Sequence, residues 1–153
     1  MKRRLLLVDD DLAVLLTLKA VLELHGFEVV TADSTAEAFA RMESGVYHMV
    51  ISDLHMETEE AGLEVIRAAH RQSYDPATAL LTAYPPSDEH VAGERSSGAG
   101  WNSEQPDSML VKPLGTSDLI RQVEALLVRH ADHHQLRQRI SASEAQLRKR
   151  SAG

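Results

Sequence analysis

Short apolar runs alternate along the chain with longer stretches in which apolar residues recur at helical spacing. The runs cover residues 4–8, 27–32, 48–53, 77–83 and 108–111. Runs of this length, rich in Val, Ile and Leu, are typical of strands that are buried on both faces. The pattern therefore predicts five strands.

Four helices are predicted between and after these strands, over residues 11–25, 34–44, 62–71 and from 116 onward. Gly26 follows the first helix as a C-terminal cap, and Ser34 with Glu37 forms a capping box that opens the second. Strands that alternate with helices of this length predict an α/β fold, a doubly wound parallel sheet with helices on both faces.

The segment 84–108 interrupts this alternation because it is rich in Pro, Gly and Ser. A further helix is expected in it, but its most helix-like part has only Val91 and Ala92 as apolar residues. We predict a short helix near 87–95, followed by a long loop that carries Trp101, the single tryptophan.

The net charge of −7 is unevenly distributed along the 153 residues. Residues 1–128 carry 10 Lys/Arg and 21 Asp/Glu, whereas residues 129–153 carry 6 and 2. This difference predicts an acidic domain over 1–128 and a basic helical extension over 129–153. The extension has no aromatic residues and no dense Lys/Arg cluster, so a solvated helix is favoured over a nucleic-acid contact.

The extension also has a thin apolar seam, formed by Leu136, Ile140 and Leu147. So short a seam does not define a coiled coil, but it allows a homodimer through the last helix and the extension. A face that is compatible with a metal site is formed by His130, His133 and His134. Solvated histidines on a polar helix are the simpler interpretation.

Composition excludes several classes of protein. There is no cysteine, so disulfides and thiolate metal sites are ruled out. No apolar run approaches the roughly 20 residues of a membrane span, and the apolar stretch at the N-terminus is too short for a signal peptide. We expect a cytoplasmic protein without membrane contacts, with room for one domain and not for a second folded output domain.

Chemically distinctive residues lie at the ends of four of the five predicted strands. In order along the chain they are Asp9-Asp10-Asp11, Asp53, Thr82 and Lys112-Pro113. In an open parallel sheet the carboxyl ends of the strands share one edge, where ligands bind. Crowded carboxylates repel one another, and a Mg²⁺ ion between them relieves that repulsion. Lys112 and Thr82 would supply further contacts for a phosphoryl group bound to the metal.

Four motifs in this order carry a resemblance to a known family. They are VDDD (8–11), ISDLHM (51–56), LLTA (80–83) and VKP (111–113). Together they make residues 3–128 similar to the response-regulator receiver domain, the CheY-like family of two-component signalling. The resemblance implies a flavodoxin-like fold with strand order 2-1-3-4-5, here with an extended C-terminal helix.

The resemblance also implies roles at the acidic positions. Asp53 would be the phosphoacceptor, which takes a phosphoryl group from a phosphohistidine of a sensor histidine kinase or a phosphotransfer protein. Mg²⁺ would be held by Asp9, Asp10, Asp53 and the backbone carbonyl of His55, with Asp10 binding directly and Asp9 through water. Asp11 is better interpreted as a residue at the N-terminus of a helix than as a further ligand.

The remaining implied roles concern the phosphoryl group and access to it. Phosphoryl binding and switching would fall to Thr82, Ala83 and Lys112. The bond before Pro113 is expected to be cis, and water access would be tuned by His55 and Tyr84. Thr82 and Lys112 are expected at strand ends outside the core.

Three departures from the family pattern affect the expected output. Glu57 follows Met56 where the family usually has proline, and ETEEAG (57–62) is one residue longer than usual, so we expect a displaced loop. Met109 stands three residues before the lysine, where the family has an aromatic switch residue. We expect the phosphorylation chemistry to be intact and the output to run through the last helix and the extension.

Two other functions fit parts of the sequence. DDDLA (9–13) matches the nucleophile motif of haloacid-dehalogenase-like phosphatases, with Asp9 as nucleophile and Asp11 as acid/base. That interpretation leaves Asp53 without a role. The other alternative is a receiver-fold scaffold that is not phosphorylated. We favour the phosphoacceptor domain, which is not an enzyme and for which nucleic acid is not an expected partner.

Overall fold

The computed structural model describes residues 2–58, 60–82, 106–112 and 115–151, and within the last helix it describes side chains as far as Asp132 and again at Gln146. The elements are β1 (Arg4–Val8), α1 (Leu12–Leu24), β2 (Glu28–Ala32), α2 (Thr35–Ser44), β3 (Met49–Asp53), α3 (Ala61–His70), β4 (Ala77–Thr82), β5 (Ser108–Val111) and α5 (Thr116–Ser151). The short helix and the loop predicted within 84–105 lie outside the described residues.

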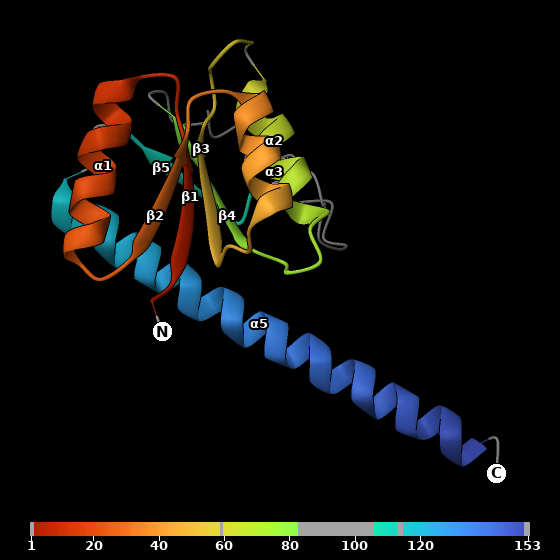
Figure 1. The fold of residues 1–153 in the computed structure, drawn as a ribbon. Helices are drawn as coiled ribbons and strands as arrows, with labels where there is room; N and C mark the ends of the chain where they lie inside the picture. The colour runs from red at the N-terminus through yellow and green to blue at the C-terminus, as the bar shows by residue number, and fades with distance from the viewer. Residues whose placement is uncertain (1, 59, 83–105, 113–114, 152–153) are drawn as a thin grey trace, which may run out of the picture.

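The five strands form one parallel sheet in the order β2-β1-β3-β4-β5, as the resemblance implied. Helices α1 and α5 cover one face, and α2 and α3 cover the other (Figure 1). Because the strands are parallel, their carboxyl ends share one edge, so the residues that follow β1, β3, β4 and β5 meet there.

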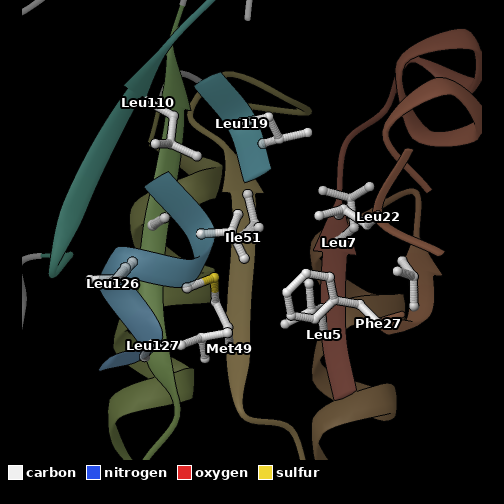
Figure 2. Packing of buried hydrophobic residues seen from close by; sticks show 14 of the residues in the cluster. Leu5, Leu7, Leu22, Phe27, Met49, Ile51, Leu110, Leu119, Leu126 and Leu127 are labelled. Atoms are coloured by element: carbon white, nitrogen blue, oxygen red, sulfur yellow. The ribbon is translucent and has the colours of Figure 1, made fainter. Parts of the chain in front are cut away.

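Alternate residues of each central strand supply the two halves of the core. Leu5 and Leu7 of β1 pack with α1 and α5, whereas Leu6 and Val8 pack with α2 and α3. Figure 2 shows the first half, in which side chains from the sheet interlock with those of both helices. A strand buried on both faces needs apolar residues at every position, which is why β1 reads as an uninterrupted run.

Helix α1 has defined caps at both ends. The Asp11 carboxylate accepts hydrogen bonds from the Ala13 and Val14 backbone N–H groups, at 2.9 and 3.4 Å. At the other end Gly26 has φ +90° and donates to the Glu23 carbonyl, and the Phe27 N–H donates to the Leu22 carbonyl. These bonds form a Schellman motif. The sequence predicted both caps.

Helix α2 begins at a partial version of the expected capping box. The Ser34 hydroxyl accepts from the Glu37 N–H at 3.1 Å, as predicted. The Glu37 carboxylate, however, accepts from the N–H of Asp33 and not from that of Ser34. The box therefore closes one residue earlier than the capping-box pattern places it.

Helix α5 runs without a break from Thr116 to Ser151, past the predicted domain boundary at 128/129. Its first part packs on the sheet through Leu119, Val123 and Leu126, among others. Its second part extends away from the rest of the molecule (Figure 1). None of the helices described in this structure is long and apolar enough to span a membrane.

Candidate metal and phosphoryl site

Three carboxylates meet at the carboxyl edge of the sheet. Asp9 and Asp10 follow β1, and Asp53 ends β3, which pairs directly with β1. One oxygen from each carboxylate lies within 4.8 Å of the other two. Asp9 is buried, Asp53 is partly exposed and Asp10 is exposed, so the cluster opens to solvent on one side. The sequence predicted this meeting from strand ends alone.

Among the residues that the structure describes, Lys112 is the cation that faces this cluster. Its Nζ lies 3.1 Å from Asp9 Oδ2 and 3.3 Å from Asp53 Oδ1. Its backbone N–H donates to the Thr82 carbonyl at 2.7 Å, which fixes the chain after β5 beside the end of β4. One ammonium against three carboxylates leaves excess negative charge, which a divalent cation would balance.

The pKa shifts reflect this crowding. Burial raises the pKa of the Asp53 carboxyl, and the neighbouring Asp9 and Asp10 add to the rise, while the charge and hydrogen bond of Lys112 oppose it without cancelling it. Burial acts to lower the pKa of the Lys112 ammonium, but its contacts with Asp9 and Asp53 outweigh burial and raise it. Asp53 therefore loses its proton less readily than an aspartate in water, whereas Lys112 holds its proton more firmly than a lysine in water.

Asp9 and Asp11 are both committed to local contacts. The Asp9 carboxylate accepts a hydrogen bond from the Asp11 N–H at 3.0 Å. The backbone N–H of Asp9 donates to the Ala32 carbonyl at 3.1 Å. Asp11 caps α1, as predicted, and does not join the three clustered carboxylates. A phosphatase of the haloacid-dehalogenase type needs Asp9 and Asp11 free for chemistry, so the structure does not favour that alternative.

Thr82 lies at the end of β4, as predicted, but the expectation that it lies outside the core is wrong. Only 1 % of its surface is exposed. Its strand is buried at every position, because β4 lies between β3 and β5 and is covered on both faces. The residue belongs to the interior as much as to the site.

The loop after β3 returns tightly to the site despite its unusual length. The Gly62 N–H donates to the Leu54 carbonyl at 3.0 Å, and a Cβ built on Gly62 would lie 2.3 Å from the Asp53 carbonyl oxygen. The backbone of α3 thus packs directly on the residue before the loop. Sequence reasoning used Gly62 as the end of the loop and the start of a helix but did not predict its contact with Asp53, for which a glycine nine residues after Asp53 was the available signal.

Glu57 holds this loop at a second point. Its carboxylate accepts from the Thr35 N–H at 2.9 Å, at the start of α2. His55 is exposed, as expected for a residue that would control access to Asp53. Where the structure describes it, the loop is therefore fastened at two points, by Glu57 and by Gly62, and its displacement relative to the family stays a prediction.

Met109 is 37 % exposed and pairs with Leu80 in the β4–β5 register. No aromatic side chain stands at this position, as the sequence shows. Three residues with assigned roles, Ala83, Tyr84 and Pro113, lie outside the described residues.

One interpretation of the extension is wrong. His130 is not solvated, because its side chain is 12 % exposed and its Nε2 lies 2.7 Å from the Asp75 carbonyl oxygen. The contact joins α5 to the loop before β4, at the edge of the sheet opposite the acidic cluster. Asp75, the partner of His130, is distant in sequence, so the helical spacing of the histidines alone did not indicate this contact.

The donor set fits a hard divalent cation. Carboxylate oxygens from adjacent strand ends, one of them solvent-accessible, are ligands that Mg²⁺ prefers, and water completes such sites. An acidic cluster and a lysine therefore lie at the carboxyl edge of an open α/β sheet, the edge at which ligands of such sheets bind.

Comparison with known proteins places this domain in a family. A family model described as "Response regulator receiver domain" matches residues 5–124. The chain belongs to this family, the phosphoacceptor domains of two-component systems.

Curated relatives extend the match. The transcriptional regulatory protein PrrA of Mycobacterium tuberculosis is 36% identical over 126 residues, which are 82% of this chain and 50% of PrrA. The alginate biosynthesis transcriptional regulatory protein AlgB of Pseudomonas syringae pv. tomato is 30% identical over 150 residues, 98% of this chain and 31% of AlgB. The chain thus spans half or less of the length of these relatives.

Solved structures agree with the fold. The response regulator TrrA of Thermotoga maritima, solved in complex with Mg²⁺ and BeF, has a TM-score of 0.63 and 33% identity, and the match covers 81% of this chain and 98% of TrrA. Chemotaxis protein CheY4 of Vibrio cholerae has a TM-score of 0.69 at 23% identity, covering 82% and 99%, and this likeness concerns the fold alone.

Proposed function

We propose that Asp53 is the phosphoacceptor of this receiver domain and takes its phosphoryl group from a phosphohistidine of a histidine kinase or phosphotransfer protein. A carboxylate oxygen of Asp53 attacks phosphorus, the P–N bond breaks, and the donor imidazole leaves with the electron pair and takes up a proton. The product is an acyl phosphate. The observation that carries the proposal is the convergence of two further carboxylates, Asp9 and Asp10, and of Lys112 on the partly exposed Asp53.

Asp9, Asp10, Asp53 and the backbone carbonyl of His55 would hold Mg²⁺, which when bound stabilises the negative charge on the transferring phosphoryl oxygens. Asp10 is exposed and suited to direct ligation, whereas Asp9 is buried and already accepts from Asp11. Asp9 therefore acts best through a water molecule, and it orients Lys112 at the same time.

Lys112 and Thr82 would bind the phosphoryl group once it is on Asp53. The Lys112 ammonium already lies 3.3 Å from Asp53 Oδ1, so new phosphoryl oxygens on that carboxylate come within its reach. Thr82 is joined to Lys112 through the backbone bond between β4 and β5. If the Thr82 hydroxyl moves toward the phosphoryl group and shifts the Thr82 backbone, this hydrogen bond would shift the backbone of Lys112 as well.

The phosphodonor protein would dock over the start of α1. Leu12 and Leu16 are 65 % and 57 % exposed, they lie one helical turn apart, and Leu12 is two residues from Asp10. Exposed apolar residues beside a reactive site favour contact with another protein. The same docking would exclude water from the phosphoryl group during transfer.

The extension would serve self-association or partner docking. The domain division at 128/129, the homodimer and the cytoplasmic location remain predictions from the sequence. The named relatives are transcriptional regulators and are longer than this chain, so contact with nucleic acid through further domains of a longer protein is a second proposal about partners.

Intact-mass spectrometry after incubation with acetyl phosphate and Mg²⁺ tests the function. One added phosphoryl group is expected in the unmodified chain and none in Asp53→Asn or in EDTA. Asp33→Asn is the matched control, because Asp33 is an exposed carboxylate that follows β2 at the same edge of the sheet but is not one of the three clustered carboxylates. Labelling of Asp53→Asn at the rate of the unmodified chain would contradict the proposal, and no labelling of any variant would favour the unphosphorylated scaffold.

A further inference from the structure

A second polar cluster lies at the edge of the sheet opposite the acidic site. We call it the latch, and it consists of Asp75, Thr78, Asp107 and His130. These residues come from the loop before β4, from β4, from the residue before β5 and from α5. No role in phosphoryl chemistry involves them, and the cluster is remote from the three carboxylates.

Asp107 fastens the beginnings of β4 and β5 together. Its Oδ2 accepts from the Thr78 N–H at 2.9 Å and from the Thr78 hydroxyl at 3.2 Å, while its own N–H lies 3.0 Å from that hydroxyl oxygen. The His70 ring, at the end of α3, also reaches the Thr78 hydroxyl, at 3.0 Å. The Asp107 side chain is 9 % exposed, so these bonds form largely out of water.

His130 ties α5 to the same point. Its Nε2 lies 2.7 Å from the Asp75 carbonyl oxygen, which can only accept, so Nε2 is the donor in this bond. Its Nδ1 faces Asp107 Oδ2 at 3.7 Å. The bond to Asp75 spans 55 residues of sequence, and it fastens α5 near the point where the helix leaves the sheet (Figure 1).

The two strands held by the latch are the strands that carry the phosphoryl-binding residues. β4 has Thr78 near its start and Thr82 at its end, and β5 is preceded by Asp107 and followed by Lys112. Thr82 and Lys112 are themselves joined by the 2.7 Å backbone bond. A displacement of these strand ends can therefore reach His130 by two routes: along the backbone of β4 to the Asp75 carbonyl, which bonds His130, and along β5 to Asp107, whose Oδ2 lies 3.7 Å from His130 Nδ1.

We propose that the latch is a conformational device that holds the extension to the receiver domain and passes a change at Thr82 and Lys112 along β4 and β5 to the exit of α5. This device offers a route to the extension that needs no aromatic residue at position 109. The coupling half of the proposal rests on the function proposed for Asp53, whereas the holding half does not.

Hydrogen–deuterium exchange of the full chain tests the holding half without phosphorylation. In His130→Ala the amides of residues 126–134 are expected to exchange about fivefold faster than in the unmodified chain, because the contact with Asp75 is lost. Asp132→Ala is the matched control, since Asp132 is exposed on the same helix two residues away. Equal exchange in His130→Ala and the unmodified chain would overturn the latch.

Adding beryllium fluoride and Mg²⁺ to the same samples tests the coupling half. Exchange is expected to change both near Asp53 and at residues 126–134 in the unmodified chain, but only near Asp53 in His130→Ala. Asp107→Asn, which keeps an acceptor for Thr78 and removes the charge that faces His130, should lose at least half of the distant response. A distant response that persists unaltered in both variants would overturn the coupling.

The two proposals fail in distinguishable ways. If no variant responds near Asp53, the function proposed for Asp53 fails and the coupling with it, while the exchange rates without beryllium fluoride still decide the latch. If the unmodified chain responds near Asp53 but not at residues 126–134, the coupling is wrong and the phosphoacceptor assignment stands.

Discussion

Two polar clusters lie at opposite ends of β4 and β5, and they differ in how their charges are balanced. At the carboxyl edge, Asp9, Asp10 and Asp53 face one cation, Lys112. At the amino edge, Asp107 takes part in three hydrogen bonds with Thr78, and the Asp75 carbonyl oxygen lies 2.7 Å from His130 Nε2.

This difference separates a reactive site from a structural one. Carboxylates that lie close together with too few positive charges repel one another, which raises the free energy of the site without a ligand. Binding of a cation relieves this repulsion. Carboxylates whose lone pairs meet donors lower the free energy of the fold instead. The comparison predicts a larger loss of stability when a carboxylate is removed from the latch than when one is removed from the acidic site.

The largest effect is expected at the backbone beneath the acidic site. Gly62→Ala would place a Cβ 2.3 Å from the Asp53 carbonyl oxygen and 2.6 Å from Leu54 Cα, both of them backbone atoms that cannot move aside alone. We expect a loss of about 3 kcal/mol in the free energy of unfolding, measured by urea denaturation. Gly115→Ala, whose new Cβ meets no atom closer than 3.7 Å, is the control. Equal stability of the two variants would show that the site does not depend on this close packing.

At the latch, removal of a carboxylate should destabilise the protein. Asp107→Ala leaves the Thr78 N–H without its acceptor in a largely buried position, at a cost of about 2 kcal/mol in the free energy of unfolding. Asp10→Ala, at the other end, removes a repulsive charge and should cost less than about 0.5 kcal/mol. Denaturation in EDTA compares the two, and a larger loss in Asp10→Ala would invalidate the contrast between the clusters.

Metal binding should distinguish the clustered carboxylates from the one that caps a helix. Asp10→Asn removes a hard, charged ligand and is expected to weaken Mg²⁺ binding about tenfold or more. Asp11→Asn keeps a capping oxygen for Ala13 and should change the affinity by less than about threefold. Titration calorimetry gives both dissociation constants. Equal weakening would mean that Asp11 ligates the metal.

A smaller effect concerns the unliganded site. The pKa of Asp53 is raised in the folded state by burial and by Asp9, so its contribution to stability is favourable below its unfolded pKa and is lost as the pH rises through the raised value. At neutral pH in EDTA, Asp53→Asn should therefore be slightly more stable than the unmodified chain, and the difference should vanish in strong acid. A less stable variant at neutral pH would mean that the ion pair with Lys112 outweighs burial.

Local patterns were sufficient for much of the fold and for part of the site. The apolar runs gave the strands to within a residue or two, Asp11 and Gly26 gave the ends of α1, and the family motifs gave the strand order. Each of these features depends on neighbours in sequence or on a pattern of residue types. The meeting of the three carboxylates followed from parallel strand ends sharing an edge.

The features that sequence reasoning missed depend on distant partners. Thr82 is buried because β3 and β5 flank its strand, and His130 is only slightly exposed because Asp75 and Asp107 meet it from two other segments. The close approach of Gly62 to Asp53 depends on how a long loop returns to the sheet. None of these contacts changes the local pattern of polar and apolar residues.

Mapping the phosphorylated residue tests the central claim most directly. After reaction with acetyl phosphate and Mg²⁺, borohydride reduces an aspartyl phosphate to homoserine, which tandem mass spectrometry of peptides then locates. The account predicts homoserine at position 53 and unmodified aspartate at positions 9, 10 and 11. Homoserine at position 9 would contradict it and restore the phosphatase-like alternative.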